Sequence, residues 1–334
     1  MTAPTPDLDR PLRIGTRASE LALWQAHHVR DRLRAAWGER LVVELVHITT
    51  EGDRIQDRPL NQIGGKGLFV NAIEERLADG SVDLAVHSMK DLPGRLHPGL
   101  AVVCTPPRED PRDALVLGPA LREALCPGGH APADLSLASL PAGARLGTTS
   151  LRRAALARRL NPALVIQPLR GNVPTRLRKL DAGDHDAILL ATAGLVRLGL
   201  GARVDARLDP EQFCPAACQG ILALESRADD ERTRALVAPL GDPAASTMAA
   251  AERAFLARLD GGCQVPMGCH AVLEGDQLHV RGTIADPSGR PCFSATRVGP
   301  HAAAAELGTA VAELLLRLGA DGVLDRLAHA HSGT

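Results

Sequence analysis

Charged and hydroxyl side chains follow the first apolar runs of this sequence. Arg17 and Ser19 come after the first run, and Lys90 and Asp91 come after the run that ends at Val86. In open α/β sheets the loops at the carboxyl ends of strands bind ligands, and helices that begin there offer free backbone amides to anions. These positions therefore predict an anion-binding site.

The same arrangement recurs further along the chain, with more arginines. Predicted strand ends near residues 147, 167 and 191 are followed by hydroxyl and guanidinium groups. Arginine binds carboxylates with paired hydrogen bonds, so several such clusters suggest a ligand with several carboxylates. Each arginine alone would be an ordinary solvated helix charge, and only their repeated position after strands favours binding. This second set comprises Thr148, Ser150, Arg152, Arg153, Arg170, Arg176 and Arg197.

Lys66 and Asp91 suggest more specific roles. Lys66 lies in Gly-Gly-Lys-Gly, residues 64–67, which lacks the spacing and the ending of a phosphate-binding P-loop but suits a loop that covers a ligand. Asp91 beside Lys90 would by default be a surface ion pair. At the end of a buried strand, among arginines, it would instead stay ionised and stabilise a cation or move a proton.

Cys263 differs from the other cysteines because it follows two glycines and precedes Gln-Val-Pro. A thiol on such a loop is incidental, a nucleophile or a metal ligand, and spacing alone does not decide between them. Cys214, Cys218 and Cys269 would complete a zinc site with it, although their spacings differ from the usual Cys-x2-Cys pairs. A zinc protein is therefore one alternative.

Composition limits the partners and the location of the protein. A net charge of −1, no tyrosine and only four phenylalanines argue against nucleic-acid binding. The first residues have no secretory pattern, and the longest apolar run, about residues 187–196, is too short to span a membrane. Seven cysteines in 334 residues form no disulfide framework, so we expect a cytoplasmic protein with free thiols.

The elements that must position these residues follow from hydrophobic periodicity. Apolar runs alternate with amphipathic segments, a pattern typical of mainly parallel sheets covered by helices. In the first part of the chain we expect strands over 12–15, 41–49 and 82–86 and helices over 19–36 and 68–79. After a Pro-, Gly- and Ala-rich stretch, residues 117–144, we expect strands over 145–147, 164–167 and 187–191 and helices over 150–160 and 174–181. A helix over 243–259, strands between 271 and 298, and final helices indicate a small α+β domain.

Seven short sequence segments occur here in the same order as in the porphobilinogen deaminase (hydroxymethylbilane synthase) family, which this chain resembles. The resemblance spans roughly residues 12–330. The segments are Arg-Ile-Gly-Thr-Arg-Ala-Ser with Leu-Ala-Leu-Trp-Gln-Ala, Gly-Gly-Lys-Gly-Leu-Phe, Val-His-Ser-Met-Lys-Asp-Leu-Pro, Arg-Glu-Asp-Pro-Arg-Asp-Ala, Gly-Thr-Thr-Ser-Leu-Arg-Arg, Leu-Arg-Gly-Asn-Val and Gly-Gly-Cys-Gln-Val-Pro. Each segment is weak evidence alone, but their shared order makes a chance resemblance negligible.

The resemblance implies an α/β fold with two periplasmic-binding-protein-like (type II) domains and a smaller α+β C-terminal domain. Domain 1 would comprise residues 1–106 and 219–238 and carry Asp91. Domain 2, residues 107–218, would supply the arginine-rich side of a cleft, and domain 3, residues 243–334, would carry Cys263.

The resemblance also implies a reaction, in which four porphobilinogen molecules condense head to tail into hydroxymethylbilane and release ammonia, in haem biosynthesis. A dipyrromethane cofactor would be joined by a thioether to Cys263, and Asp91 would stabilise the azafulvene-type cations and take up protons. Porphobilinogen would be the small-molecule partner of a monomer that binds neither nucleic acid nor membrane. The pyrrole carboxylates would be bound by Arg17, Ser19, Lys66, Lys90, Thr148, Ser150, Arg152, Arg153, Arg170, Arg176 and Arg197.

The sequence departs from the family pattern at three places. Gln62 stands where the family often has lysine, Cys218 replaces the usual glycine, and residues 121–138 resemble an insertion. The alternative function is a non-catalytic two-domain cleft protein that binds a poly-carboxylate ligand. Such a protein needs neither Cys263 nor Asp91.

Overall fold

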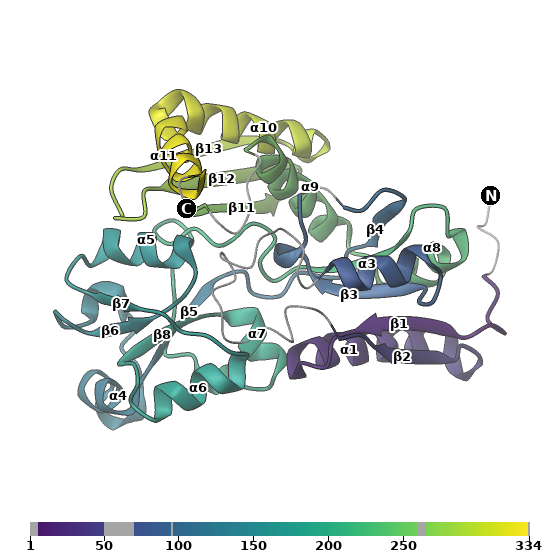
Figure 1. Ribbon diagram of the computed structural model, residues 1–334, viewed down its shortest axis with the longest axis horizontal. Helices are drawn as coiled ribbons and strands as arrows, with labels where there is room; N and C mark the ends of the chain where they lie inside the picture. Colours follow the sequence, from purple (N-terminus) through teal and green to yellow (C-terminus); the bar gives the residue numbers. More distant parts are fainter. Residues whose placement is uncertain (1–5, 50–69, 95, 260–264, 333–334) are drawn as a thin grey trace. The chain divides into compact units, whose positions relative to one another are not determined.

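The structure is a computed structural model that describes residues 6–49, 70–94, 96–259 and 265–332 (Figure 1). The chain divides into two compact units. Unit 1 comprises Met1–Glu109 and Ile221–Ser246, and unit 2 comprises Asp110–Gly220 and Thr247–Thr334. Unit 1 is therefore discontinuous in sequence. The predicted boundaries of three domains remain predictions.

Unit 1 is built on a five-stranded sheet with the order β2-β1-β3-β10-β4. β1 is parallel to β2 and β3, whereas β10 is antiparallel to β3 and β4. The chain re-enters this sheet beside the carboxyl end of β3, where Met89 N donates to the Ile221 carbonyl at 2.9 Å, so β10 must run back along β3. The strands are β1 Leu12–Thr16, β2 Val43–His47, β3 Leu84–Ser88, β4 Leu100–Cys104 and β10 Leu222–Arg227.

Helices cover both faces of this sheet. On one face, Val29 and Leu33 of α1 (Glu20–Trp37) share a core with alternate strand residues such as Leu84. On the other, α3 (Asn71–Ala78) packs Ile73 and Leu77 in a core that includes Ala85, the next residue of β3. A short helix, α8 (Glu231–Val237), joins the first face. The predicted strands and helices of this region are thus confirmed, with small shifts at their ends.

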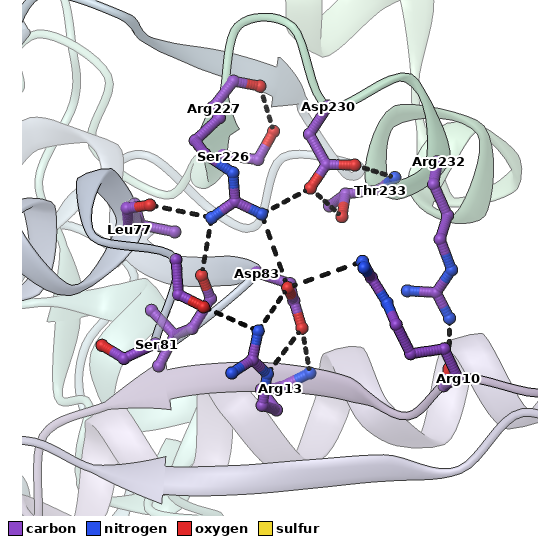
Figure 2. Close-up of polar contacts among 12 residues, drawn as sticks. Arg10, Arg13, Leu77, Ser81, Asp83, Ser226, Arg227, Asp230, Arg232 and Thr233 are labelled. Atoms are coloured by element: carbon purple, nitrogen blue, oxygen red, sulfur yellow. Dashed lines mark hydrogen bonds and ion pairs between the residues drawn. The ribbon is translucent and has the colours of Figure 1, made fainter.

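A cluster of charges ties the amino ends of β1 and β3 together (Figure 2). The Asp83 side chain is 1% exposed and accepts hydrogen bonds from Arg13 Nε at 3.0 Å and Arg13 Nη2 at 2.9 Å. Arg227, at the end of β10, reaches the same carboxylate at 3.4 Å and Asp230 at 2.7 Å. Arg10 is a weaker partner at 3.7 Å. This cluster lies at the end of the strands opposite Arg17 and Asp91.

Unit 2 contains a second five-stranded sheet with the order β7-β6-β8-β5-β9. β6 is parallel to β7 and β8, while β5 is antiparallel to β8 and β9. β10 in unit 1 and β5 in unit 2 are the strands that cross over from the other part of the chain. When they are left out of the numbering, the order in both sheets is second, first, third, crossing strand, fourth, which is the arrangement of type II periplasmic-binding-protein domains. The predicted fold class is correct, although each sheet contains antiparallel strands. The strands are β5 Asp113–Leu117, β6 Arg145–Gly147, β7 Val165–Gln167, β8 Ala187–Ala191 and β9 Ala206–Arg207.

The helices of this sheet follow the strands closely. Leu115, Leu146 and Leu156 belong to one core, and Leu177 and Ile188 belong to the core on the other side. The stretch 117–144, expected to be loop-like, contains a short helix, α4. The helices are α4 Pro119–Leu125, α5 Leu151–Leu160, α6 Val173–Asp181 and α7 Thr192–Arg197.

The last part of unit 2 has its own three-stranded antiparallel sheet, as the sequence predicts for the small α+β region. Phe255, Val311 and Leu315 pack against this sheet. Gly282 is required on the packed face, because a Cβ there would lie 2.6 Å from Phe255 and 2.7 Å from Val311. The elements are α9 Pro243–Arg258, β11 Met267–Glu274, β12 Gln277–Ala285, β13 Cys292–Pro300, α10 Ala304–Leu315 and α11 Asp321–Ser332. Across the described part of the chain, every helix is too short or too polar to cross a membrane.

Candidate active site

The predicted residues of unit 1 lie at one edge of its sheet. β1 and β3 are parallel neighbours, with Ile14 opposite Leu84, so their carboxyl ends meet. Half-buried Arg17 directly follows β1. The side chain of Ser19 caps α1 by accepting a hydrogen bond from Ala22 N at 3.4 Å.

Lys90 and Asp91 lie in a single 3-10 turn, Met89–Asp91, directly after β3. Lys90 is half-buried and Asp91 is exposed. The turn is held by its buried neighbours: Met89 is 2% exposed, and Leu92 N donates to the Met89 carbonyl at 3.1 Å. Asp91 is therefore an exposed carboxylate on a fixed backbone.

Gln25 supports the same turn and was not singled out in the sequence. It is buried in α1, and its Nε2 donates to Ser88 Oγ at 2.8 Å. The signal was its place in the segment Leu-Ala-Leu-Trp-Gln-Ala, where a polar residue occupies the buried face of an amphipathic helix.

Three ionisable side chains are buried behind this turn, on the face of the sheet covered by α3. His87 Nε2 lies 3.0 Å from Glu225 Oε2, and these side chains are 7% and 0% exposed. Glu74 of α3 is 5% exposed. Burial and the nearby charge of Glu225 raise the pKa of Glu74, so this carboxyl retains a proton more readily than an ordinary glutamic acid.

The predicted hydroxyl residues of unit 2 shape the start of α5. Thr148 follows β6 and is buried, and its Oγ1 accepts a hydrogen bond from Ser150 N at 3.2 Å. Ser150 Oγ in turn accepts from Arg153 N at 3.4 Å and caps the helix. The carboxyl end of β6 therefore leads directly into a helix N-terminus, the arrangement expected of an anion site.

Arg152 and Arg153 both contact Asp113, the first residue of β5. Arg152 Nη1 donates to Asp113 Oδ2 at 2.7 Å, and Arg153 Nε donates to Asp113 Oδ1 at 2.8 Å. All three side chains are buried. Burial alone would raise the pKa of Asp113, but the charges of Arg152 and Arg153 outweigh it and hold that pKa far below its usual range. Asp113 was not predicted as a site residue.

The remaining predicted arginines occupy the other strand ends of unit 2. Arg176 Nε donates to the Gly171 carbonyl at 2.7 Å, in the loop between β7 and α6 that also contains half-buried Arg170. Arg197, at the end of α7, is buried, and its Nη2 donates to the Gly220 carbonyl at 2.7 Å. Unit 2 thus presents guanidinium groups after β6, β7 and β8, as the sequence predicts.

Two predicted residues, Lys66 and Cys263, lie outside the described residues. Among the residues that are described, no three His, Cys, Asp or Glu side chains are grouped to hold a metal. The Cys214 thiol is buried, and burial raises its pKa to about 12.

Cys218, which replaces the usual glycine of the resemblance, has a positive φ of 61°. The family's preference for glycine here therefore has a conformational reason, because the left-handed region is costly for other residues. Its backbone N–H is held by the carboxylate of buried Glu252, whose other oxygen accepts from Ala271 N at 2.7 Å.

The fold and these strand ends define a class of α/β proteins with type II periplasmic-binding-protein topology and basic side chains at the strand ends of both sheets. Residues 12–235 match the family described as "Porphobilinogen deaminase, dipyromethane cofactor binding domain", and residues 246–317 match "Porphobilinogen deaminase, C-terminal domain". The chain belongs to the porphobilinogen deaminase family.

Relatives match over nearly their whole length. A porphobilinogen deaminase of Roseiflexus castenholzii is 52% identical over 94% of this chain and 98% of the relative. One of Syntrophotalea carbinolica is 50% identical over 95% of this chain and 96% of the relative. Among solved structures, the alkanesulfonate-binding protein SsuA of Xanthomonas axonopodis pv. citri is similar at a TM-score of 0.37 and 16% identity, covering 77% of this chain and 76% of that one. That distant likeness carries no information about ligands.

Proposed function

We propose that this chain is a hydroxymethylbilane synthase, a transferase that joins four porphobilinogen molecules head to tail and releases ammonia. The observation that carries the proposal is the combination of arginines at the strand ends of unit 2 with an exposed carboxylate, Asp91, on a fixed turn of unit 1. The membership of the chain in the porphobilinogen deaminase family supports the same reaction.

The residues fit an acidic pyrrole cofactor. Each pyrrole derived from porphobilinogen carries an acetate and a propionate, so a dipyrromethane brings several carboxylates. Buried guanidinium groups at Arg152, Arg153 and Arg197 and the capped N-terminus of α5 are suited to such groups. When bound, the dipyrromethane supplies the pyrrole carbon to which new units are added. The full binding set we propose is Arg17, Ser19, Lys66, Lys90, Thr148, Ser150, Arg152, Arg153, Arg170, Arg176 and Arg197.

Asp91 is the residue we propose for the charge and proton steps. Departure of ammonia from porphobilinogen leaves positive charge on the substrate, and a fixed carboxylate lowers the energy of that charge. The new carbon–carbon bond then leaves a proton to be removed from the attacked ring, and an Asp91 carboxylate oxygen can accept it. The short turn after β3 holds the backbone that carries this carboxylate.

Cys263 is the residue we propose as the covalent anchor, on the basis of the matching Gly-Gly-Cys-Gln-Val-Pro segment. The thioether keeps the growing chain attached while units are added. We further propose that the protein is cytoplasmic and works as a monomer. Size-exclusion chromatography with light scattering tests the monomeric state.

Intact-mass measurement of the purified chain tests the proposed function. We expect the mass of the polypeptide plus two linked porphobilinogen units, and turnover of added porphobilinogen. Cys263→Ser should show the bare polypeptide mass and no turnover, since a hydroxyl is a far weaker nucleophile than a thiolate. Cys292→Ser, at a half-buried cysteine of unit 2, is the control and should retain the adduct.

A wild-type mass equal to the bare polypeptide, unchanged after incubation with porphobilinogen, would contradict the proposal. That result would favour the non-catalytic binding protein instead.

A further inference from the structure

Asp113 lies among the strand ends that carry the predicted ligand arginines of unit 2. It begins β5, and its backbone pairs with Ala191, the last residue of antiparallel β8. Its side chain is completely buried. Its two carboxylate oxygens are used by different arginines: Oδ2 by Arg152 and Oδ1 by Arg153.

Each of the two guanidinium groups also has a backbone acceptor. Arg152 Nη1 donates to the Cys214 carbonyl at 2.7 Å, and Arg153 Nη1 donates to the Leu189 carbonyl at 3.1 Å. The guanidinium of Arg152 also lies over the Phe213 ring, 5.7 Å from its centre. With two acceptors in different directions, a planar guanidinium group has a single orientation.

Gln219 fixes the carboxylate from a third direction. Its Nε2 donates to Asp113 Oδ1 at 3.2 Å and to the Pro111 carbonyl at 2.8 Å. The next residue, Gly220, accepts the hydrogen bond from Arg197. Asp113 therefore joins the predicted ligand arginines and the segment through which the chain leaves unit 2.

We propose that Asp113 is a positioning residue, which holds Arg152 and Arg153 in the orientation that receives the carboxylates of an acidic pyrrole ligand. This inference rests on the proposed function. A long arginine side chain loses conformational entropy when a ligand orders it, and prior ordering removes that cost from binding. A guanidinium group has five N–H donors, so contact with Asp113 is compatible with binding a second carboxylate.

A purely structural role for Asp113 is the competing explanation, because removing a buried carboxylate from arginines destabilises any protein. Asp205 provides a matched control at the other end of β5. Its side chain is 4% exposed, its Oδ1 accepts from Arg122 Nε at 2.8 Å, and its Oδ2 accepts from Leu117 N at 2.7 Å. Both positions are therefore buried carboxylates at an end of β5 that bind arginines of nearby helices, Arg122 of α4 for Asp205 and two arginines of α5 for Asp113.

The test compares Asp113→Asn with Asp205→Asn in the full chain. For Asp113→Asn we expect KM for porphobilinogen to rise about tenfold or more with a smaller change in kcat, since the lost interaction acts mainly on binding. We also expect a lower yield of cofactor adduct, by intact mass, when cofactor-free protein is incubated with porphobilinogen. Asp205→Asn should lower the melting temperature but keep the wild-type KM and adduct yield.

Equal KM values and adduct yields for the two variants would overturn the inference. If Asp113→Asn does not fold, Gln219→Ala is measured instead. This variant keeps the charge of Asp113 but removes the hydrogen bond from Gln219 that orients its carboxylate, and we expect KM to rise about threefold. An unchanged KM in that variant would also overturn the inference. Absence of turnover and adduct in the wild-type chain would instead refute the proposed function, so the two failures are distinguishable.

Discussion

Asp91 and Asp113 show how the surroundings of a carboxylate decide its role. Both lie at strand ends next to basic residues, but Asp91 is exposed and Asp113 is completely buried. The exposed carboxylate is available to a cationic substrate. The buried one is already used by two arginines, so its effect on a ligand must pass through them.

Asp91→Asn tests the charge role at the scale of a single residue. The amide keeps the size of the side chain but cannot neutralise a cation or accept its proton, so we expect turnover to fall by roughly 10²–10⁴-fold with an unchanged melting temperature. Steady-state kinetics and thermal unfolding check this. Asp229→Asn, at an exposed position after β10, should keep wild-type turnover. Near-normal turnover of Asp91→Asn would remove Asp91 from the mechanism.

Basic and hydroxyl residues at strand ends could be predicted from the sequence, but the buried residues that hydrogen-bond to them could not. Arg152, Arg153 and Arg197 were found because periodicity locates strand ends and helix starts. Asp113, Gln25 and Gln219 were missed because they act through contacts with residues far away in sequence. Asp113, for example, pairs with arginines some 40 positions further along the chain.

At the scale of elements, the sequence predicts β1, β2 and β3 but not β10, which contains buried polar residues. β10 reads Leu-Ala-Leu-Glu-Ser-Arg, and its Glu225 and Ser226 are fully buried. Such a pattern does not suggest a central strand, because buried glutamate is rare without tertiary partners. β5 was missed for a similar reason, since it starts with the buried charge of Asp113.

The charge cluster at the amino ends of β1 and β3 is expected to stabilise the folded protein, and removing the Asp83 charge tests this (Figure 2). Asp83→Asn should lower the free energy of unfolding at pH 7 by about 2–3 kcal/mol, less than for fully buried pairs because the side chains of Arg10 and Arg13 are 54% and 36% exposed. Denaturant unfolding of the wild type and variant checks this. Asp9→Asn, in a surface pair with Arg40, is the control and should change it by about 0.5 kcal/mol or less.

The same variant has a defined pH dependence. Burial would raise the pKa of Asp83, but hydrogen bonds and charge from Arg13 outweigh it and lower that pKa below its ordinary value. A carboxyl with a lowered pKa contributes stability above its ordinary pKa of about 3.9 and loses it as the pH falls through the folded-state value. The difference between wild type and Asp83→Asn should therefore be constant near neutrality and shrink below about pH 4. A difference that grows on acidification would contradict this.

At the scale of the whole molecule, the discontinuity of unit 1 is its main organising feature. β10 lies between β3 and β4, yet more than a hundred residues separate it from β4 in the chain. Leu224 and Leu236 of the returning segment belong to the same core as Leu12 and Leu33 of the first. Unit 1 is therefore complete only when both segments are present.

Two shortened chains test this dependence. Residues 6–109 alone should lack a cooperative thermal transition, because the sheet has lost its strand between β3 and β4. Residues 6–109 joined to residues 221–246 by a Gly/Ser linker should regain one. Circular dichroism during heating distinguishes the two, and equal behaviour of both chains would refute the prediction.

The returning strand also sets the order of events during translation. The ribosome releases β3 and β4 long before β10, and at ordinary synthesis rates the delay is on the order of ten seconds. Throughout that time the facing edges of two apolar strands stay unpaired, and such edges are sites of aggregation. The first part of the chain to be made therefore cannot finish folding until β10 has been made, so cellular folding assistance is most needed while residues 105–221 are being synthesised.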